Sequence, residues 1–527
     1  MSRGHLSLIL HAHLPYVRHP EHDDFLEEDW LFEAITETYI PLVDLLQRQL
    51  DDGHRPRLAM SLTPPLCHML RDDLLQRRYL RYIERLIALA ESEAERVRGD
   101  ETLRGIVAMY RERFSTCRRL FAEVWGRDLV AQFAALQEAG ALEIITCGAT
   151  HGFLPLLADS PEAVRAQIML ARDDYQRHFG RPPRGIWLPE CAYFPGLDET
   201  LREADLRWFV LDSHGLMFGS SQPRHAIYQP VYTPAGPAAF ARDRESSRQV
   251  WSAEEGYPGD PAYRDFYRDI GFDLSREYLE RFFPGELPRR FTGLKYHRIS
   301  GRGAHKELYN RGWAQAAVDA HAGDFMHSRA SQIAKLAGAM DGAPVVVSPF
   351  DAELFGHWWF EGPQFLDLLL RKSLYDQNVF SLATPGDHLE RHSLQQCLQP
   401  SASSWGNMGY WEVWLDDSNS WLYPHLHSAA KRMSRLARRH RDGDDPLIER
   451  WLAQLARELL LAQSSDWAFL MRTGTAKAYA EQRSRDHIRR FNTLHDQFLG
   501  GRPDYDFLAD CEWRDNIFPQ LEWRHFC

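Results

Sequence analysis

Short apolar runs recur along the chain as far as residue 385, and each one ends at a turn or a cluster of polar residues. Such runs predict strands, and seven stand out: 5–10, 57–64, 141–148, 184–190, 206–212, 343–351 and 378–385. Most are apolar on both faces and are separated by stretches long enough for a crossover helix, which is typical of a parallel sheet covered by helices. We therefore predict an α/β fold, and we favour closure of the sheet into a distorted TIM-like barrel over an open sheet.

Three regions depart from this alternation. Residues of about 68–140 carry long amphipathic patterns rich in Glu, Arg, Leu and Ala, which predict a helical insertion. Residues of about 220–290 are rich in Pro, Gly, Tyr, Arg and Asp with little periodicity, so we expect a long ordered loop over the active face. Beyond about residue 400, helical periodicity replaces the strand signals. The expected division is a barrel domain over 1–399 and a helical domain over 400–527.

Composition narrows the classes of partner. Lys and Arg total 62 against 74 Asp and Glu, a net charge of −12, so the chain offers no general attraction to nucleic acid or to an anionic membrane. No run of about 18 apolar residues occurs and the start lacks a signal-type stretch, so we expect a cytoplasmic protein. Seven scattered cysteines fit reduced thiols. The 16 Trp, 20 Tyr and 28 Phe suit the faces of sugar rings as well as protein cores.

Polar side chains follow four of the predicted strands directly: His11 and His13, then His151, then Glu190, then Asp351 with Glu353. In a parallel barrel the carboxyl ends of the strands form the active face. We therefore expect these side chains to converge on one site.

The two histidines after the first strand are spaced i, i+2, so both rings project to the same side of an extended segment. Such a pair could bind a metal, contact sugar hydroxyl or carboxylate groups, or make structural hydrogen bonds. A zinc site needs a third protein ligand, and the chain has neither an HExxH motif nor a Cys/His quartet. Contacts to sugar are the favoured interpretation.

Glu190 and Asp351 each follow an apolar strand, among neighbours that can shift the pKa of a carboxyl group. Two carboxyl groups facing each other across a cavity can cleave a glycosidic bond, one attacking the anomeric carbon and the other protonating the leaving oxygen. The alternative is that each acid caps a helix or pairs with Arg. If Asp351 is the wrong acid, Glu353 is the best substitute.

Two residues of the later chain add weaker signals. Trp405 lies in a Ser/Gly/Asn-rich loop, where a large aromatic ring is suited to act as a platform for sugar. Asp466 comes near the end of an apolar helical pattern, and a buried Asp there would need polar partners.

Five segments occur in the order HAHLP, GATHGFLPLL, WLPECAYFPG, SPFDAELFGHWWFEG and SSWGNMGYWEVWLDD, from residue 11 to about residue 421. Together they resemble the five signature regions of glycoside hydrolase family 57. The third segment, with Cys after the Glu, looks like the branching-enzyme subgroup of that family, as does the chain length with a helical C-terminal domain. The resemblance implies an incomplete (β/α)7 barrel, a retaining mechanism, no metal and no cofactor.

By this resemblance, Glu190 matches the family nucleophile and Asp351 the general acid/base. The substrate-binding positions that it implies are His11, His13, His151, Trp405, Asp466, Arg268 in YRDFYRDIGFD, Gly285 in FFPGE, and a mobile loop tyrosine, for which Tyr232 is the best match and Tyr228 the rival. The C-terminal helical domain would contribute to the glucan-binding cleft.

The implied reaction cleaves an α-1,4 glucan link through a covalent glycosyl-enzyme and transfers the segment to a 6-hydroxyl, which makes an α-1,6 branch of the glycogen type. α-1,4-Glucan would then be both donor and acceptor. A 4-α-glucanotransferase or α-amylase of the same family would use the same carboxyl groups. More distant alternatives are a metal-dependent polysaccharide deacetylase, favoured by the histidine pair, and a glucan-binding protein with a degenerate barrel.

Overall fold

A ring of strands forms the centre of the computed structural model, which describes residues 2–252, 255–283, 289–301, 303 and 305–527. Within these residues, seven strands make up the ring: β1 (Gly4–Ala12), β2 (Leu58–Leu62), β3 (Leu142–Ile145), β4 (Gly185–Ile186), β5 (Trp208–Leu211), β7 (Ala238–Ala241) and β8 (Val345–Asp351). The first strand is buried at all of its positions, because it lies between neighbours and is covered on both faces.

The ring closes at two junctions between shorter sheets. Parallel ladders join β3, β2, β1 and β8 in that order, and others join β4, β5 and β7. Thr146 pairs in parallel with Ile186, which joins β3 to β4. The backbone N–H of Asp243 donates to the carbonyl of Val347 at 2.8 Å, which joins the end of β7 to β8. The result is a TIM-like barrel.

Each of the seven predicted runs contains an observed strand, but one of them is not part of the ring. The run at 378–385 contains β9 (Phe380–Leu382), which pairs in parallel with the first residues of β1. Its place in the ring is taken by β7, which lies inside the region that the sequence predicted as a loop. That region also holds other short elements: β6 (Val231–Tyr232), α11 (Arg244–Trp251), α12 (Ile270–Asp273) and α13 (Arg276–Leu279).

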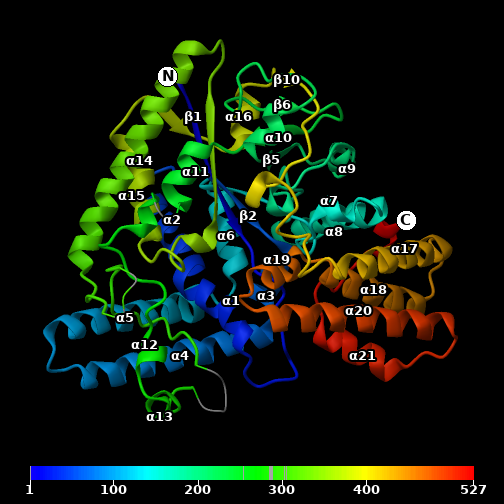
Figure 1. Cartoon of the computed structure of the whole chain (residues 1–527), viewed down its shortest axis with the longest axis horizontal. Helices are drawn as coiled ribbons and strands as arrows, with labels where there is room; N and C mark the ends of the chain where they lie inside the picture. Colours follow the sequence, from blue (N-terminus) through cyan, green and yellow to red (C-terminus); the bar gives the residue numbers. More distant parts are fainter. Residues whose placement is uncertain (1, 253–254, 284–288, 302, 304) are drawn as a thin grey trace.

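The region of about 68–140 is helical in the structure, with α3 (Pro64–Arg71), α4 (Asp73–Arg96), α5 (Glu101–Arg119) and α6 (Leu129–Glu138). Figure 1 shows α4 and α5 lying along one lower side of the molecule. Asp72, Asp100 and Asp128 cap α4, α5 and α6, because each side chain accepts a hydrogen bond from a backbone N–H in the first turn.

Other helices surround the strands: α1 (Asp29–Ala34), α2 (Ile40–Asp51), α7 (Leu154–Leu157), α8 (Pro161–Phe179), α9 (Leu197–Glu203), α10 (Ser213–Met217), α14 (Arg311–Ala339), α15 (Gly362–Tyr375) and α16 (Pro385–Arg391). A short strand, β10 (Gln396–Cys397), pairs with β6. Within the described residues, none of the helices combines the length and apolar character needed to cross a membrane.

The C-terminal region is helical, with α17 (Leu422–His440), α18 (Pro446–Ala462), α19 (Ser465–Thr473), α20 (Lys477–Leu499) and α21 (Tyr505–Arg514). Figure 1 shows these helices grouped on the side of the molecule opposite α4 and α5, with α19 reaching toward the strands. The domain boundary at residues 399 and 400 stays a prediction.

Candidate active site

Strand register brings three polar side chains to one end of the barrel. His11 lies near the end of β1 and is opposite Asp351, the last residue of β8, and opposite Ser61 on β2. Because these strands are parallel, their carboxyl ends lie at the same edge. The Nδ1 atom of His11 lies 3.1 Å from the hydroxyl of Ser61, which fixes the orientation of the ring.

The three predicted histidines form one stack. Nε2 of His11 lies 3.0 Å from Nε2 of His151, and the rings of His13 and His151 stack with 3.8 Å between centroids. His11 also stacks on the indole of Trp187 at 4.9 Å. Burial first, and then the charges of neighbouring histidines, lower the pKa of His11 and His151 well below the ordinary value, so both rings are neutral near pH 7.

The first turn of α19 in the C-terminal region supports this stack. Nε2 of His13 lies 2.9 Å and 3.1 Å from the two carboxylate oxygens of Asp466, and Nδ1 of His151 lies 2.8 Å from the hydroxyl of Ser465. Burial alone would raise the pKa of Asp466, but the charge and hydrogen bond of His13 outweigh it and lower the pKa to about 2. The C-terminal region therefore completes the site on the barrel.

Glu190 is held in an unusual backbone conformation. Its φ is +63° and that of Cys191 is +50°, in the left-handed region that non-glycine residues seldom adopt. Such strain costs about 1–3 kcal/mol per residue and is found at functional sites. The indole N–H of Trp405 donates to Oε2 of Glu190 at 2.7 Å, and the backbone N–H of Trp405 donates to the carbonyl of Glu190 at 3.0 Å. The conformation is therefore held by direct contacts.

Both predicted catalytic carboxyl groups have a raised pKa. Burial raises the pKa of Glu190 to about 8, and the charges of Asp351 and Asp466 add to the shift, whereas the hydrogen bond from Trp405 opposes it. Burial, followed by the charge of Glu353, raises the pKa of Asp351 well above its ordinary value. The charge of Asp351 thus acts on Glu190, and both carboxyl groups are buried from water.

Glu353, the alternative candidate for the general acid/base, makes contacts that support the local structure. It accepts hydrogen bonds from the hydroxyl of Tyr39 and from the backbone N–H of His13, the latter at 3.1 Å. Burial raises its pKa to about 7. Because both contacts hold neighbouring segments in place, Glu353 is better suited to support the site than to react in it.

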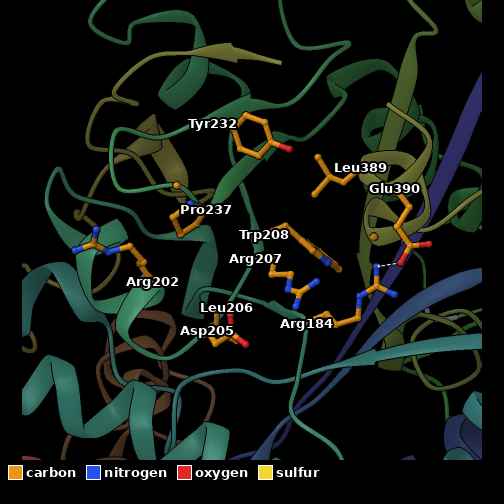
Figure 2. Close-up of a pocket in the computed structure, with 12 residues that line it drawn as sticks. Arg184, Arg202, Asp205, Leu206, Arg207, Trp208, Tyr232, Pro237, Leu389 and Glu390 are labelled. Atoms are coloured by element: carbon orange, nitrogen blue, oxygen red, sulfur yellow. Dashed lines mark hydrogen bonds and ion pairs between the residues drawn. The ribbon is translucent and has the colours of Figure 1, made fainter. Parts of the chain in front are cut away.

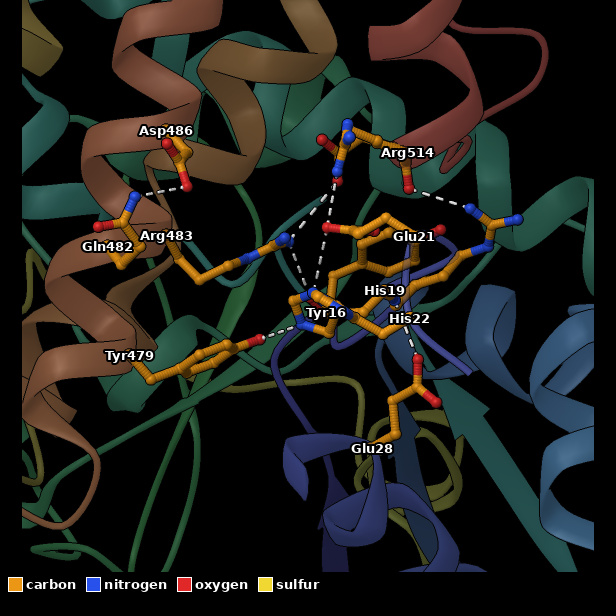
Figure 3. Close-up of polar contacts among 12 residues, drawn as sticks. Tyr16, His19, Glu21, His22, Glu28, Tyr479, Gln482, Arg483, Asp486 and Arg514 are labelled. Atoms are coloured by element: carbon orange, nitrogen blue, oxygen red, sulfur yellow. Dashed lines mark hydrogen bonds and ion pairs between the residues drawn. The ribbon is translucent and has the colours of Figure 1, made fainter. Parts of the chain in front are cut away.

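The segment after β1 is anchored on the C-terminal helices. His19 lies 2.8 Å from the hydroxyl of Tyr479, and Arg483 donates to the carbonyl of Tyr16 at 3.2 Å. Figure 3 shows Tyr479 and Arg483 pointing from α20 toward this segment, with Arg514 approaching it from α21. These contacts fix the chain that carries His13.

Two groups of site residues could hold a metal ion by proximity, since ligand atoms of His13, His151 and Asp466 lie within 4.8 Å of one another, as do those of His11, Cys147 and His151. The ring nitrogens of His13 and His151 are already occupied, however. Those of His13 face Thr63 and Asp466, and those of His151 face Ser465 and His11. A metal would have to displace these bonds, so the described contacts fit hydrogen bonding within the site better than metal chemistry.

Sequence comparison assigns the chain to a known family. The sequence model described as glycosyl hydrolase family 57 matches residues 7–400. The chain belongs to this family. A second model, described as the C-terminal part of 1,4-alpha-glucan branching enzyme, matches residues 425–526. This membership argues against the deacetylase alternative.

Solved structures resemble the chain along nearly its whole length. A structure described as the alpha-amylase AmyC from Thermotoga maritima is 46% identical, with a TM-score of 0.93 and 99% of each chain covered. A branching enzyme from Pyrococcus horikoshii is 34% identical, with a TM-score of 0.89, covering 99% of this chain and 97% of the other. The curated 1,4-alpha-glucan branching enzyme TK1436 from Thermococcus kodakarensis is 34% identical over 98% of this chain and 77% of its own length.

The expectation that Tyr232 covers the active face of this family 57 chain is wrong. Tyr232 pairs with Ala238, which pairs with Trp208, the first residue of β5, so Tyr232 lies at the amino end of the barrel. Figure 2 shows it facing a pocket of about 360 Å³ together with Trp208 and Leu389. The rival, Tyr228, is at the same end, because its carbonyl accepts from the N–H of Val345 at the start of β8.

Arg268, whose assignment rested on spacing more than on a motif, is not brought into the site. Arg268 pairs with Asp273 at 2.9 Å, and none of its contacts within the described residues joins it to the histidines or to Glu190. Gly285 lies outside the described residues.

The structure adds site residues that the sequence analysis missed. Arg242, just after β7, forms an ion pair with Asp212 at 2.6 Å, lies over the ring of Trp405, and opposes the rise in the pKa of Asp351. Trp251, at the end of α11, contacts Trp405 edge to face, with 6.4 Å between the ring centroids. Its side chain is 40% exposed. A signal for Asp212 was present, because it is the last residue of the predicted strand 206–212, as Glu190 and Asp351 are of theirs.

Proposed function

We propose that this chain is a 1,4-α-glucan branching enzyme, which cuts an α-1,4 link and joins the released segment to a 6-hydroxyl of a glucan. The observation that carries the proposal is the match of residues 425–526 to the C-terminal model of branching enzymes. That part of the chain includes α19, which places Asp466 and Ser465 against His13 and His151. The region typical of branching enzymes therefore belongs to the site itself.

Glu190 is proposed as the nucleophile and Asp351 as the general acid/base. A retaining mechanism needs an ionised nucleophile and a protonated acid at the start. The indole N–H of Trp405 can only donate, so it favours the carboxylate form of Glu190. Burial and the nearby Glu353 favour the protonated form of Asp351. The hydrogen bond from Trp405 therefore acts toward the proton distribution that the mechanism needs, against burial and the charge of Asp351, which raise the pKa of Glu190 to about 8.

In the first step Glu190 would attack C1 of the donor glucose while Asp351 protonates the leaving O4. In the second step Asp351 would take the proton from the incoming 6-hydroxyl, which displaces Glu190 from C1. Water competes with this hydroxyl. The rings of Trp187 and Trp251 each contact the ring of Trp405 beside Glu190. Trp187 is buried, whereas Trp251 is 40% exposed, and an exposed aromatic surface there can bind a sugar ring and reduce access of water.

α-Amylase activity is the second candidate, because the 46% identical Thermotoga structure is described as an alpha-amylase. An amylase would use the same carboxyl groups, with water as the acceptor. The distinction lies in the product, because hydrolysis creates reducing ends and branching creates α-1,6 links without them.

The test is incubation of the purified chain with amylose, followed by proton NMR and a reducing-end assay. We expect α-1,6 anomeric signals to grow while reducing ends stay nearly constant. Glu190→Gln and Asp351→Asn are the matched controls, because each keeps the size of the side chain and should remove nearly all turnover. Growth of reducing ends without α-1,6 signals would establish the amylase instead.

A further inference from the structure

Three histidines meet at the end of the barrel opposite the proposed active site. His5 lies at the start of β1, while His388 and His392 lie on α16 and at its C-cap. The latter two are spaced i, i+4, which places both on one side of the helix. Figure 1 shows the N-terminus and α16 at the same end of the molecule, near β6 and β10.

The nitrogens of these rings are close enough to share one ion. Nδ1 of His5 lies 2.9 Å from Nδ1 of His388, and one nitrogen from each of the three rings lies within 4.8 Å of the others. Two nitrogens on a tetrahedral zinc are about 3.3 Å apart, since each Zn–N bond is about 2.0–2.1 Å. His392 is partly exposed, so rotation of its ring can close the remaining gap.

Hydrogen bonds alone leave this cluster incompletely satisfied. Arg391 can only donate, and it reaches Nε2 of His5 at 3.5 Å, so the proton of His5 is on Nδ1 and points to Nδ1 of His388. The proton of His388 must then be on Nε2, which is buried and has no hydrogen-bond partner within the described residues. His388 is fully buried, so this N–H stays without a partner for as long as the hydrogen bond between the two Nδ1 atoms is kept.

The surroundings keep the three rings in the form that a metal needs. Burial is the first cause of a lowered pKa for all three, and it lowers the pKa of His5 to about 4 and that of His388 to about 3. Neutral imidazole is the state that binds zinc. The carboxyl group of Asp387 affects His5 but is held by Arg57 at 2.7 Å and 2.8 Å, so it does not form an ion pair with the cluster.

Other groups of possible ligands outside the active site are less suitable. At His68, Asp174 and His178, the guanidinium of Arg71 donates to Nδ1 of His178, which leaves the proton on the opposite nitrogen and adds positive charge. At Glu458, His487 and Asp515, the acid of Asp515 is already paired with Arg490 in a fully buried site. At His5, His388 and His392, Arg391 also donates to a ring nitrogen and adds positive charge, but Arg391 is exposed, and its contact with Nε2 of His5 is longer than that of Arg71 with His178, at 3.5 Å against 2.8 Å.

We propose that His5, His388 and His392 bind a divalent transition metal of the zinc class, which fixes α16 to the start of β1. The fourth position would be taken by water. The site is structural, since β1 and β8 separate it from Glu190 and Asp351 along the length of the barrel. By linking α16 to β1, the ion would stabilise the closed ring of strands.

The experiment uses the full chain, stripped with a chelator and then incubated with a small excess of Zn²⁺ before gel filtration. We expect elemental analysis to find about one zinc per chain and thermal melting to show a Tm raised by a few degrees. Activity on amylose below the melting temperature should be the same in the stripped and the loaded protein. Co²⁺ in place of Zn²⁺ should give the absorption of a tetrahedral nitrogen site.

Two variants locate the ion. His392→Gln alters a partly exposed position at a helix end, so it should fold, and it should weaken zinc binding at least about tenfold and remove the rise in Tm. His178→Gln changes another histidine cluster and should bind zinc like the wild type. Failure of the wild type to retain zinc would overturn the proposal. So would zinc retained by His392→Gln, or zinc that inhibits turnover, which would place the ion at His13, His151 and Asp466.

Discussion

Trp405 holds Glu190 from two directions, with its indole N–H on the carboxylate at 2.7 Å and its backbone N–H on the carbonyl at 3.0 Å. The two residues are 215 positions apart in the sequence. The backbone bond supports the left-handed conformation of Glu190, and the indole bond orients its carboxyl group. A single tryptophan therefore fixes the position of the proposed nucleophile and favours its carboxylate form against the effect of burial.

Trp405→Phe tests this relationship while keeping an aromatic ring. Hydrogen bonds to a charged group contribute about 1.5–3 kcal/mol, so kcat/KM should fall about 10-fold to 100-fold. Loss of the donor should raise the pKa of Glu190 further, because the hydrogen bond from Trp405 lowers it. The acidic limb of the pH–rate profile should then move by about one pH unit to higher pH. A lower rate with an unmoved acidic limb would limit Trp405 to binding sugar.

Glu190→Gln should stabilise the protein while it removes turnover. The pKa of Glu190 is about 8 in the folded chain against an ordinary value of 4.5, so the carboxyl group costs stability once the pH rises above 4.5, and the full cost is reached above pH 8. Replacement by neutral Gln should therefore raise Tm at pH 8 and leave it unchanged near pH 4. Glu95→Gln, at an exposed position on α4, is the control and should change Tm at neither pH. An equal rise at both pH values would contradict the assignment.

Asp466→Asn should have the opposite pH dependence. The pKa of Asp466 is lowered to about 2 from an ordinary value of 3.8, so its carboxylate contributes stability above pH 3.8 that is lost as the pH falls through 2. That difference in pKa corresponds to about 2 kcal/mol, so the variant should be less stable by about this amount at pH 7. Chemical unfolding at several pH values measures it. A stability difference that stays constant from pH 7 to pH 3 would show that packing, not the charge, is responsible.

Trp251→Ala should change the fate of the glycosyl-enzyme. Trp251 is exposed at the end of α11 and contacts Trp405, so it is placed to bind acceptor glucan and to limit water. We expect hydrolysis to rise relative to transfer, measured as reducing ends formed per α-1,6 link. Tyr232→Ala, at the other end of the barrel, is the matched control and should leave the ratio unchanged. If the ratio of hydrolysis to transfer changed in Tyr232→Ala and not in Trp251→Ala, Tyr232 would be the residue that limits water.

The sequence pattern was sufficient for most of the barrel, because a buried parallel strand is a continuous apolar run. It was insufficient for β7, whose four residues AAFA follow Gly236 and Pro237 and read as part of a loop. That one omission had two consequences. Tyr232 was placed at the wrong end, and Arg242, which follows the missing strand, was not considered.

The candidate site was predicted where a local rule applied. A polar residue directly after an apolar strand identified His11, Glu190 and Asp351, and consistent use of the rule would have identified Asp212. Contacts between distant segments follow no local pattern. The bond between His13 and Asp466 joins residues 453 positions apart, and only the docking of α19 on the barrel creates it.

That long-range bond has a consequence for the synthesis of the protein. The barrel strands leave the ribosome well before α19 does, so a partly made chain can hold Glu190 and Asp351 while His13 still lacks its carboxylate. The surroundings of His13 are therefore incomplete until α19 has been made and has docked on the barrel.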